Sequence, residues 1–263
     1  MDKIEIQILN PGALHHAEKM AAAAARLTQK GHKIKNMEDF LNLYEKGSSY
    51  KFLQSLAQLP HPTLQKFAVI NIVVVGASRR FLAQITRHQN EVKFMSASLQ
   101  YSDYSTEADF VVPYEMLDNP RARTLYLESC RDQMDIYQEL IGGGVDNDAA
   151  GYAAPQGLRN VLIISATPYQ WKHMISQRVC RRNTDETRYV MLRIWEELCY
   201  LSPALFSNCG PFCMNGECKE GRMTCGRPIN KIALPGGILA VDFPLLRPSD
   251  FKDPALEDID NED

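Results

Sequence analysis

The chain has 263 residues, of which 45% are hydrophobic and 23% charged, and its formal net charge is −3. This length and apolar content suffice for one well-packed domain, with room for two, and the slightly acidic charge argues against duplex nucleic acid as a main partner. The first residues are polar and show no signal-peptide core, and no apolar run approaches the roughly 20 residues that span a bilayer. We therefore expect a soluble, cytoplasmic protein without membrane partners.

The first third of the chain predicts one strand and three helices. Residues 4–9 alternate as a strand does. Residues 13–29 are rich in alanine and predict a long helix. Asn36 can cap a second helix, with Asp39 completing a capping box, and a third helix covers residues 50–59.

The central stretch predicts a buried strand that leads into a cationic helix. Residues 68–77 have the length and β-branched content of a buried strand, which Gly76 interrupts. Ser78 can cap the helix that follows, and this helix carries Arg87 and His88 at its end. A polar, hydroxyl-rich loop comes next. Such an arrangement favours a phosphate-bearing ligand; the alternative is an amphipathic helix with a solvated end.

The second half predicts three further helices and one more buried strand. Residues 121–141 show helical spacing of apolar positions and would pack one face on the core. Residues 158–166 predict the strand. Thr167 can cap a helix over residues 167–183, and residues 186–201 predict a core helix.

The predicted helix at residues 167–183 also gathers positive charge. It carries His173, Arg178, Arg181 and Arg182. Charged runs of this kind are often solvated helix faces, and that interpretation stays open beside a role in binding an anionic ligand. A third interpretation, from a different class of protein, is a zinc-loop module that binds nucleic acid through this helix.

Four of the seven cysteines lie close together near the C-terminus. Cys209, Cys213, Cys218 and Cys225 fall within 17 residues of a glycine-rich segment. Four thiolates can satisfy tetrahedral zinc, and metal binding would then order the loop. Free thiols are the alternative. Residues 230–245 predict a last apolar strand, and the acidic tail after it predicts disorder.

The motif between Gly76 and Tyr101 resembles the signature of the flavin-dependent thymidylate synthases. That family carries Gly-Val-Ser-Arg, then Gln-x-x-Arg-His-Arg, then a serine followed closely by Arg-Tyr. The matching positions here are Gly76, Ser78, Arg79, Gln84, Arg87, His88, Ser98 and Tyr101. Arg178 and Glu186 also match an Arg-x7-Glu spacing of the family.

The resemblance implies an α+β fold with a central, mostly antiparallel sheet flanked by helices, assembled as a homotetramer with active sites between subunits. Residues 1–205 would form the catalytic domain, and residues 206–263 a Cys/Gly-rich extension with an acidic tail. The implied reaction is the reductive methylation of dUMP to dTMP. Methylenetetrahydrofolate would supply the carbon, FAD would carry the hydride and NADPH would reduce the flavin.

The resemblance also assigns roles to individual residues. Arg178 would stabilise charge on the uracil ring, and Ser98 would donate a hydrogen bond to the substrate rather than act as a nucleophile. The FAD-binding candidates are Thr28, His61, Thr63, Arg87, His88, Gln89, His173 and Arg182. The substrate-binding candidates are Gln84, Ser96, Ser98, Gln100, Tyr101 and Arg178.

Three positions depart from the family pattern. Gln89, Gln100 and Gly151 stand where the family places arginines, and the spacing from Gln89 to Ser98 is eight residues instead of seven. Each charge-assisted hydrogen bond lost is worth about 1.5–3 kcal/mol, although neighbouring arginines could compensate. The alternative is therefore a diverged flavoenzyme of the same fold that acts on another pyrimidine nucleotide.

Overall fold

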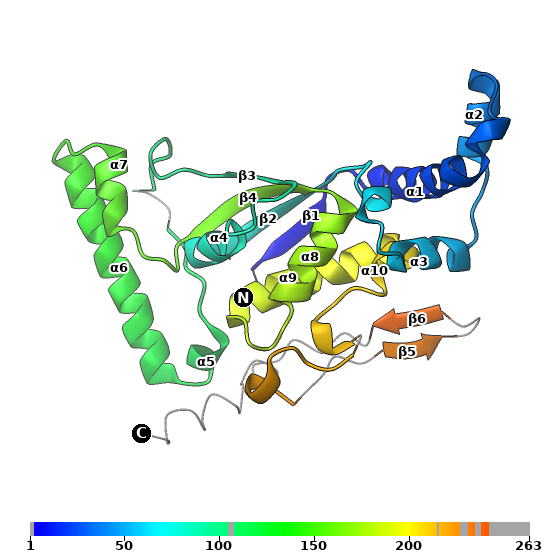
Figure 1. Cartoon of the computed structure of the whole chain (residues 1–263). Coiled ribbons are helices and arrows are strands. Elements are labelled where there is room, and N and C mark those ends of the chain that lie inside the picture. The colour runs from blue at the N-terminus through cyan, green and yellow to red at the C-terminus, as the bar shows by residue number, and fades with distance from the viewer. Residues whose placement is uncertain (1–2, 105–107, 215, 227–230, 235–237, 242–263) are drawn as a thin grey trace.

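A four-stranded antiparallel sheet lies at the centre of the computed structural model, which describes residues 3–104, 108–214, 216–226, 231–234 and 238–241 (Figure 1). The strands, in their order across the sheet, are β1 (Glu5–Ile8), β2 (Ile70–Ser78), β4 (Arg159–Ala166) and β3 (Val92–Ser96). This sheet, with helices around it, confirms the expected α+β class.

Ten α-helices are found in the described part of the chain. They are α1 (Gly12–Lys30), α2 (Met37–Glu45), α3 (Tyr50–Gln58), α4 (Arg79–Ile85), α5 (Tyr114–Leu117), α6 (Pro120–Gly142), α7 (Asn147–Ala150), α8 (Pro168–Arg178), α9 (Asp185–Leu201) and α10 (Pro203–Phe206). Five 3-10 turns accompany them: η1 (Gly31–Lys33), η2 (Pro62–Gln65), η3 (Gly151–Ala153), η4 (Phe212–Met214) and η5 (Gly221–Met223). A separate antiparallel hairpin joins β5 (Lys231–Leu234) and β6 (Ile238–Val241). In Figure 1, α6 and α7 stand at one end of the molecule and α2 at the other. No helix in the described part of the chain combines the length and the apolar character that crossing a membrane requires.

One face of the sheet forms the main core. Alternate side chains of β2 and β4, among them Ile72 and Ile164, point to this face and are fully buried. Helices α4, α8 and α9 pack on it, with Trp171 of α8 and Trp195 of α9 fully buried. The helical periodicity of α8 and α9 is what the sequence predicted. The apolar run of β2 predicted a buried strand, but over Ile70–Val75 only every second side chain is fully buried.

The opposite face of the sheet is apolar and exposed. Val75 pairs with Val161 across β2 and β4, and Ile163 pairs with Val73 on one side and Met95 on the other. Val75, Val161 and Ile163 are each exposed by 40–42%, and Met95 by 73%. Contiguous exposed apolar side chains are typical of an interaction surface. We call these five residues the outer sheet face.

Two expectations about local structure were wrong. Residues 92–96 were expected in a polar loop, but they form the edge strand β3, because their backbone pairs with β4 regardless of their polar side chains. The helix expected at residues 167–183 ends at Arg178. The Asn183 side chain donates to the Gln177 carbonyl (2.5 Å), an acceptor that a continued helix would have used.

Candidate active site

The site begins where β2 leads into α4. Ser78 is the N-cap of α4, and its hydroxyl oxygen accepts a hydrogen bond from the Phe81 amide (3.1 Å). This confirms the predicted cap. Helix α4 then runs for two turns, packing Phe81 and Ile85 into the core, and it presents Arg87 and His88 just beyond its C-terminal end.

Glu186 fixes this junction from the start of α9. Its carboxylate accepts hydrogen bonds from the Ser78 amide (2.6 Å) and from the Ser78 hydroxyl. Burial raises the pKa of Glu186, and the two bonds from Ser78 oppose that rise. The two residues of the Arg-x7-Glu motif therefore have different roles. Glu186 holds the turn between β2 and α4, and Arg178 lines the site.

Arg178 is the centre of a hydrogen-bond network. Its Nε donates to Nε2 of His88 (2.9 Å) and its Nη2 to the carbonyl oxygen of Gln84 (2.9 Å). Its Nη1 donates to Oδ1 of Asn183 (3.3 Å). The predicted Gln84 therefore contributes its backbone to the network. Because three residues from two separate segments hold the guanidinium, its position is set before any ligand arrives.

His88 is neutral in this network. Arginine can only donate, so Nε2 of His88 must be unprotonated to accept. Burial lowers the pKa of His88 to about 4, and the charges of Arg178 and His173 contribute to this shift. The rings of His88 and His173 meet edge to face, with centroids 5.7 Å apart. Burial, followed by the charge of Arg87, also lowers the pKa of Arg178.

These side chains line a polar cleft of about 450 Å³. Its lining residues are Arg87, His88, Gln89, Asn90, Gln170, His173, Gln177 and Arg178. Five of them were site candidates from sequence. Asn90, Gln170 and Gln177 were not, nor was the supporting Asn183; their only signal is that they neighbour the candidates along the chain. The arginines and amides suit a planar, anionic ligand.

A second cavity, of about 660 Å³, adjoins the cleft through His173, which lines both. It is bordered by the turn at residues 57–65, which carries the candidates His61 and Thr63 and packs on α8. Nζ of Lys172 donates to the Ala57 carbonyl in its wall (3.2 Å). Burial lowers the pKa of Lys172 to about 8, so this amine is less fully charged near neutral pH than an exposed lysine.

Several predicted site residues lie away from the Arg178 cleft. Val92 pairs with Ala166, next to the start of α8, whereas Ser96 pairs with Leu162. At about 3.3 Å per residue, Ser96 is roughly 13 Å further along the sheet. The candidates beyond it, Ser98, Gln100 and Tyr101, surround Leu99, which packs in the apolar cluster of α6. A single chain therefore does not bring these candidates to Arg178.

Two cofactor candidates also lie outside the cleft. The Thr28 hydroxyl donates to the Ala25 carbonyl within α1 (2.8 Å). Arg182 lines a third cavity, between the end of α8 and the C-terminal extension. Cys213, Cys218 and Cys225 line that cavity too, but Cys209 does not: it is buried, and its Sγ donates to the Phe206 carbonyl (3.0 Å). The structure thus separates Cys209 from the other three zinc candidates.

A family profile described as "Thymidylate synthase complementing protein" matches residues 12–204, the greater part of the chain. The chain belongs to this family. The flavin-dependent thymidylate synthase of Geobacter sulfurreducens is 25% identical over 211 residues, covering 80% of this chain and 89% of the relative. That of Thermococcus onnurineus is 26% identical over 171 residues, covering 62% of this chain and 69% of the relative.

Solved structures support the fold of this Thymidylate synthase complementing protein family member. Thymidylate synthase X from Helicobacter pylori, solved with FAD and dUMP, superposes with a TM-score of 0.60 at 16% identity, covering 78% of this chain and 98% of that one. The UMP/dUMP methylase PolB from Streptomyces cacaoi, bound with 5-Br dUMP, gives 0.61 at 14% identity, covering 78% and 93%.

Proposed function

We propose that this chain catalyses the flavin-dependent reductive methylation of dUMP to dTMP. The observation that carries this proposal is the arrangement of Arg178, His88 and Gln84 in one cleft, in a chain of this family. The relatives named flavin-dependent thymidylate synthase support it, as does the fold shared with an enzyme that holds FAD and dUMP.

The residues around the cleft fit FAD. Arg87 and Gln89 offer donors to an anionic, planar cofactor, and His88 and His173 offer ring faces and ring nitrogens. We include the nearby turn with His61 and Thr63, and Thr28 and Arg182, as further contacts. When bound, FAD supplies the hydride chemistry; methylenetetrahydrofolate as carbon donor and NADPH as reductant complete the proposed reaction.

Arg178 would act on the pyrimidine ring. A fixed guanidinium against the uracil carbonyl edge stabilises negative charge on the ring and so makes its C5 atom more nucleophilic. Because neutral His88 accepts from Nε of Arg178, it holds this guanidinium without competing for its charge. Ser98 would donate a hydrogen bond to the substrate, and Ser96, Gln100 and Tyr101 would shape its pocket.

We further propose that the second group of residues comes from a neighbouring subunit. Ser98, Gln100 and Tyr101 lie away from Arg178 in one chain, and the outer sheet face is apolar and exposed. A homotetramer would cover this face and bring the serine-rich loop of one copy to the Arg178 cleft of another. The outer sheet face consists of two rows across the strands, Val75–Val161 and Val73–Ile163–Met95. Glu5 and Gln7 of β1 flank these rows, and an apolar patch with a polar rim suits such an interface.

A specific observation favours a second candidate function. Gln100 and Gly151, two of the positions where the family has arginine, are brought together: a Cβ on Gly151 would lie 3.1 Å from Cβ of Leu99, the neighbour of Gln100. The two missing arginines would therefore have lain side by side, and their absence would weaken the same contact with a nucleotide phosphate. The same fold serves a protein described as a UMP/dUMP methylase. Another pyrimidine nucleotide is thus the alternative substrate.

The experiment that tests the proposal is an absorption spectrum of the purified protein, incubated with FAD, before and after adding dUMP. Flavin bands that dUMP perturbs would support thymidylate synthesis. Flavin bands that respond to UMP or another pyrimidine nucleotide but not to dUMP would favour the alternative. Absence of bound flavin would overturn both and favour a binding module.

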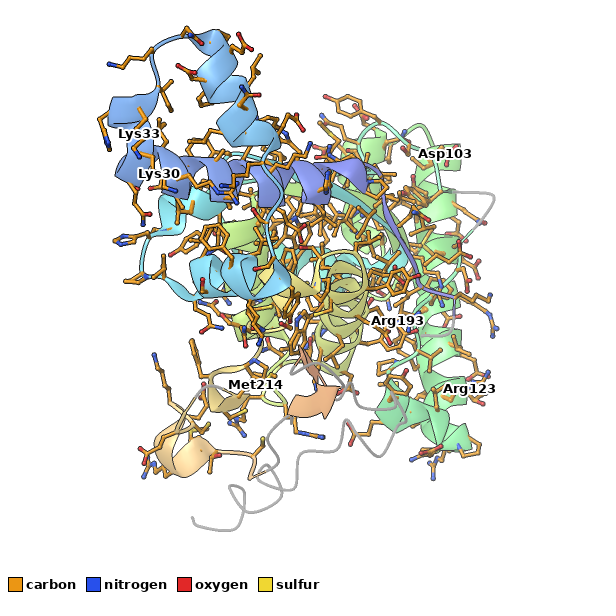
Figure 2. All side chains as sticks on the ribbon, turned by 90° about the vertical axis from the view of Figure 1, so that its right-hand side faces the viewer. Lys30, Lys33, Asp103, Arg123, Arg193 and Met214 are labelled. Carbon is orange, nitrogen blue, oxygen red and sulfur yellow. The ribbon has the colours of Figure 1, made fainter. Side chains whose placement is uncertain are left out.

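Turnover of two variants would test the assigned roles. Arg178→Ala should lower the rate by about 100-fold or more, because a preorganised charge contact is lost. Ser98→Ala should lower it by about tenfold, the effect of one hydrogen bond. Arg123→Ala is the matched control, since Arg123 lies exposed on α6 at the edge of the molecule (Figure 2). A wild-type rate in either test variant would remove that residue from the mechanism.

A further inference from the structure

A cavity of about 240 Å³ lies between the end of α8 and the C-terminal extension, and four cysteines line it. Cys180 lies two residues after the end of α8, while Cys213, Cys218 and Cys225 belong to the extension. Cys180 is more than thirty residues distant from the others along the chain, so only folding brings it to them. No sequence spacing pointed to this set.

The part of the extension from residue 216 to residue 226 has little apolar packing to hold it there. Among the described residues from 216 to 226, every residue is exposed except Cys218 and Cys225, which are half-buried. The segment contains only the short turn η5, and Figure 2 shows the extension near Met214 at the base of the molecule, beyond the main helices. Cys218 and Cys225 are thus the least exposed residues of this segment, and they line the cavity together with Glu220 and Thr224. A metal ion bound by the thiols would supply the order that apolar packing does not.

The charges around the cavity suit a metal–thiolate centre. Four thiols and the carboxyl group of Glu220 line the cavity. A divalent cation would balance the negative charge that the thiols acquire when they lose their protons. A zinc ion with four thiolates carries a net charge of −2, and Arg181 and Arg182, which also line the cavity, would offset that charge.

We propose that Cys180, Cys213, Cys218 and Cys225 form a tetrahedral Zn²⁺ site that joins the extension to the end of α8. As the described side chains stand, no group of three or more His, Cys, Asp and Glu residues is arranged to hold an ion. Binding would therefore draw the thiols inward, each losing its proton to solvent. Gly216 and Gly226, which have positive φ and open space around them, lie within two residues of Cys218 and Cys225 and would allow these cysteines to turn.

The site would also stabilise the loop that supports Arg178. Cys180 lies between Arg178 and Asn183, the residue that accepts from Arg178 and caps Gln177. Anchoring Cys180 would limit movement of this loop. The inference does not depend on the proposed reaction, because its test measures metal and thiols alone.

The first test is differential alkylation of the full chain, with Zn²⁺ present and after its removal by a chelator. Peptide mass spectrometry should show Cys180, Cys213, Cys218 and Cys225 protected together by Zn²⁺. Cys209, buried against Phe206, should label equally under both conditions. Labelling of Cys180 that ignores Zn²⁺, or Zn²⁺-dependent protection of Cys209 in its place, would overturn the proposal.

The second test uses matched variants and metal titration. Wild-type protein should bind about one Zn²⁺ per chain, and Co²⁺ in its place should show thiolate charge-transfer absorption. Cys180→Ser should weaken Zn²⁺ binding by at least about tenfold, whereas Cys209→Ser should bind as the wild type does. Equal binding by Cys180→Ser and wild type would sink the idea. If Cys180→Ser does not fold, the alkylation of wild-type protein decides.

Discussion

At the scale of single residues, the site depends on a neutral histidine that accepts from an arginine. His88 takes the role usually given to a carboxylate, but without a negative charge, so Arg178 keeps its full positive charge for a ligand. A carboxylate in its place would neutralise part of that charge. The burial of His88 is what makes the neutral form persist at physiological pH.

This protonation state predicts a pH dependence of stability. The pKa of His88 is lowered from 6.5 to about 4 in the folded protein. As pH falls, the unfolded chain therefore binds a proton at His88 before the folded chain does. The stability contributed by neutral His88 is complete above about pH 6.5 and is lost as pH falls towards 4. Thermal melts between pH 7 and 4.5 should show this loss.

Two variants isolate the contribution of His88. His88→Gln keeps an acceptor but cannot titrate, so its melting temperature should fall less steeply with decreasing pH than that of the wild type. His15→Gln, an exposed position on α1, should follow the wild-type slope. Identical slopes for wild type and His88→Gln would show that His88 does not carry the effect.

At the scale of elements, β2 carries both a bulge and the start of the site. Gly76 has φ +82°, and the register between β2 and β4 shifts between Val75 and Ala77. A Cβ on Gly76 would lie 2.7 Å from the carbonyl oxygen of Lys3, which is backbone and cannot easily move. The bulge is what redirects the chain from the strand towards Ser78 and α4.

We expect Gly76→Ala to lower the free energy of unfolding by about 2–4 kcal/mol, since it adds both a strained φ and a backbone clash. Chemical denaturation monitored by circular dichroism would measure this loss. Gly142→Ala is the control, because it lies at the end of α6 with no atom close to its Cβ position. A Gly76→Ala variant as stable as this control would contradict the account of the bulge.

The link between α9 and the β2–α4 turn predicts a second loss. Glu186→Ala leaves the Ser78 amide and hydroxyl without their buried acceptors, so the free energy of unfolding should fall by about 2–4 kcal/mol. Glu128→Ala, on the exposed face of α6, should change it by less than about 0.5 kcal/mol. Denaturant titration of the three proteins checks both values.

At the scale of the whole molecule, the exposed outer sheet face requires an explanation. A monomer would leave Val75, Val161, Ile163 and Met95 in water beside one another. Assembly with further copies of the chain would bury them. The same assembly would bring together the Arg178 cleft and the loop around Ser98, which a single chain holds apart.

Disruption of this face should therefore reduce both assembly and activity. We expect Val161→Lys to shift the wild-type oligomer to smaller species in sedimentation velocity, because it places a charge in the centre of the apolar rows. Met37→Lys, which replaces an isolated exposed side chain of α2 (70% exposed), should leave the oligomer intact. An unchanged oligomer in Val161→Lys would place the interface elsewhere.

The sequence alone determined the elements and the chemistry they carry. Apolar runs predicted β2 and β4, and helical periodicity predicted α8 and α9. Capping residues such as Ser78 and Asn36 marked where helices begin. These features are local, since they depend on neighbours a few residues apart. The spaced motif around Arg87, His88 and Arg178 likewise indicated the family that the profile match shows.

The tertiary structure decided which of these residues meet. It placed Arg178 on His88, turned the chain after Arg178 and added β3 as an edge strand. It separated Cys209 from the other predicted zinc ligands and brought Cys180 to them. Such contacts arise from packing between segments that are far apart in the chain. Local sequence patterns do not show which distant segments will pack together. For that reason the sequence identified most of the candidate site residues, and only the tertiary structure determined which of them contact one another.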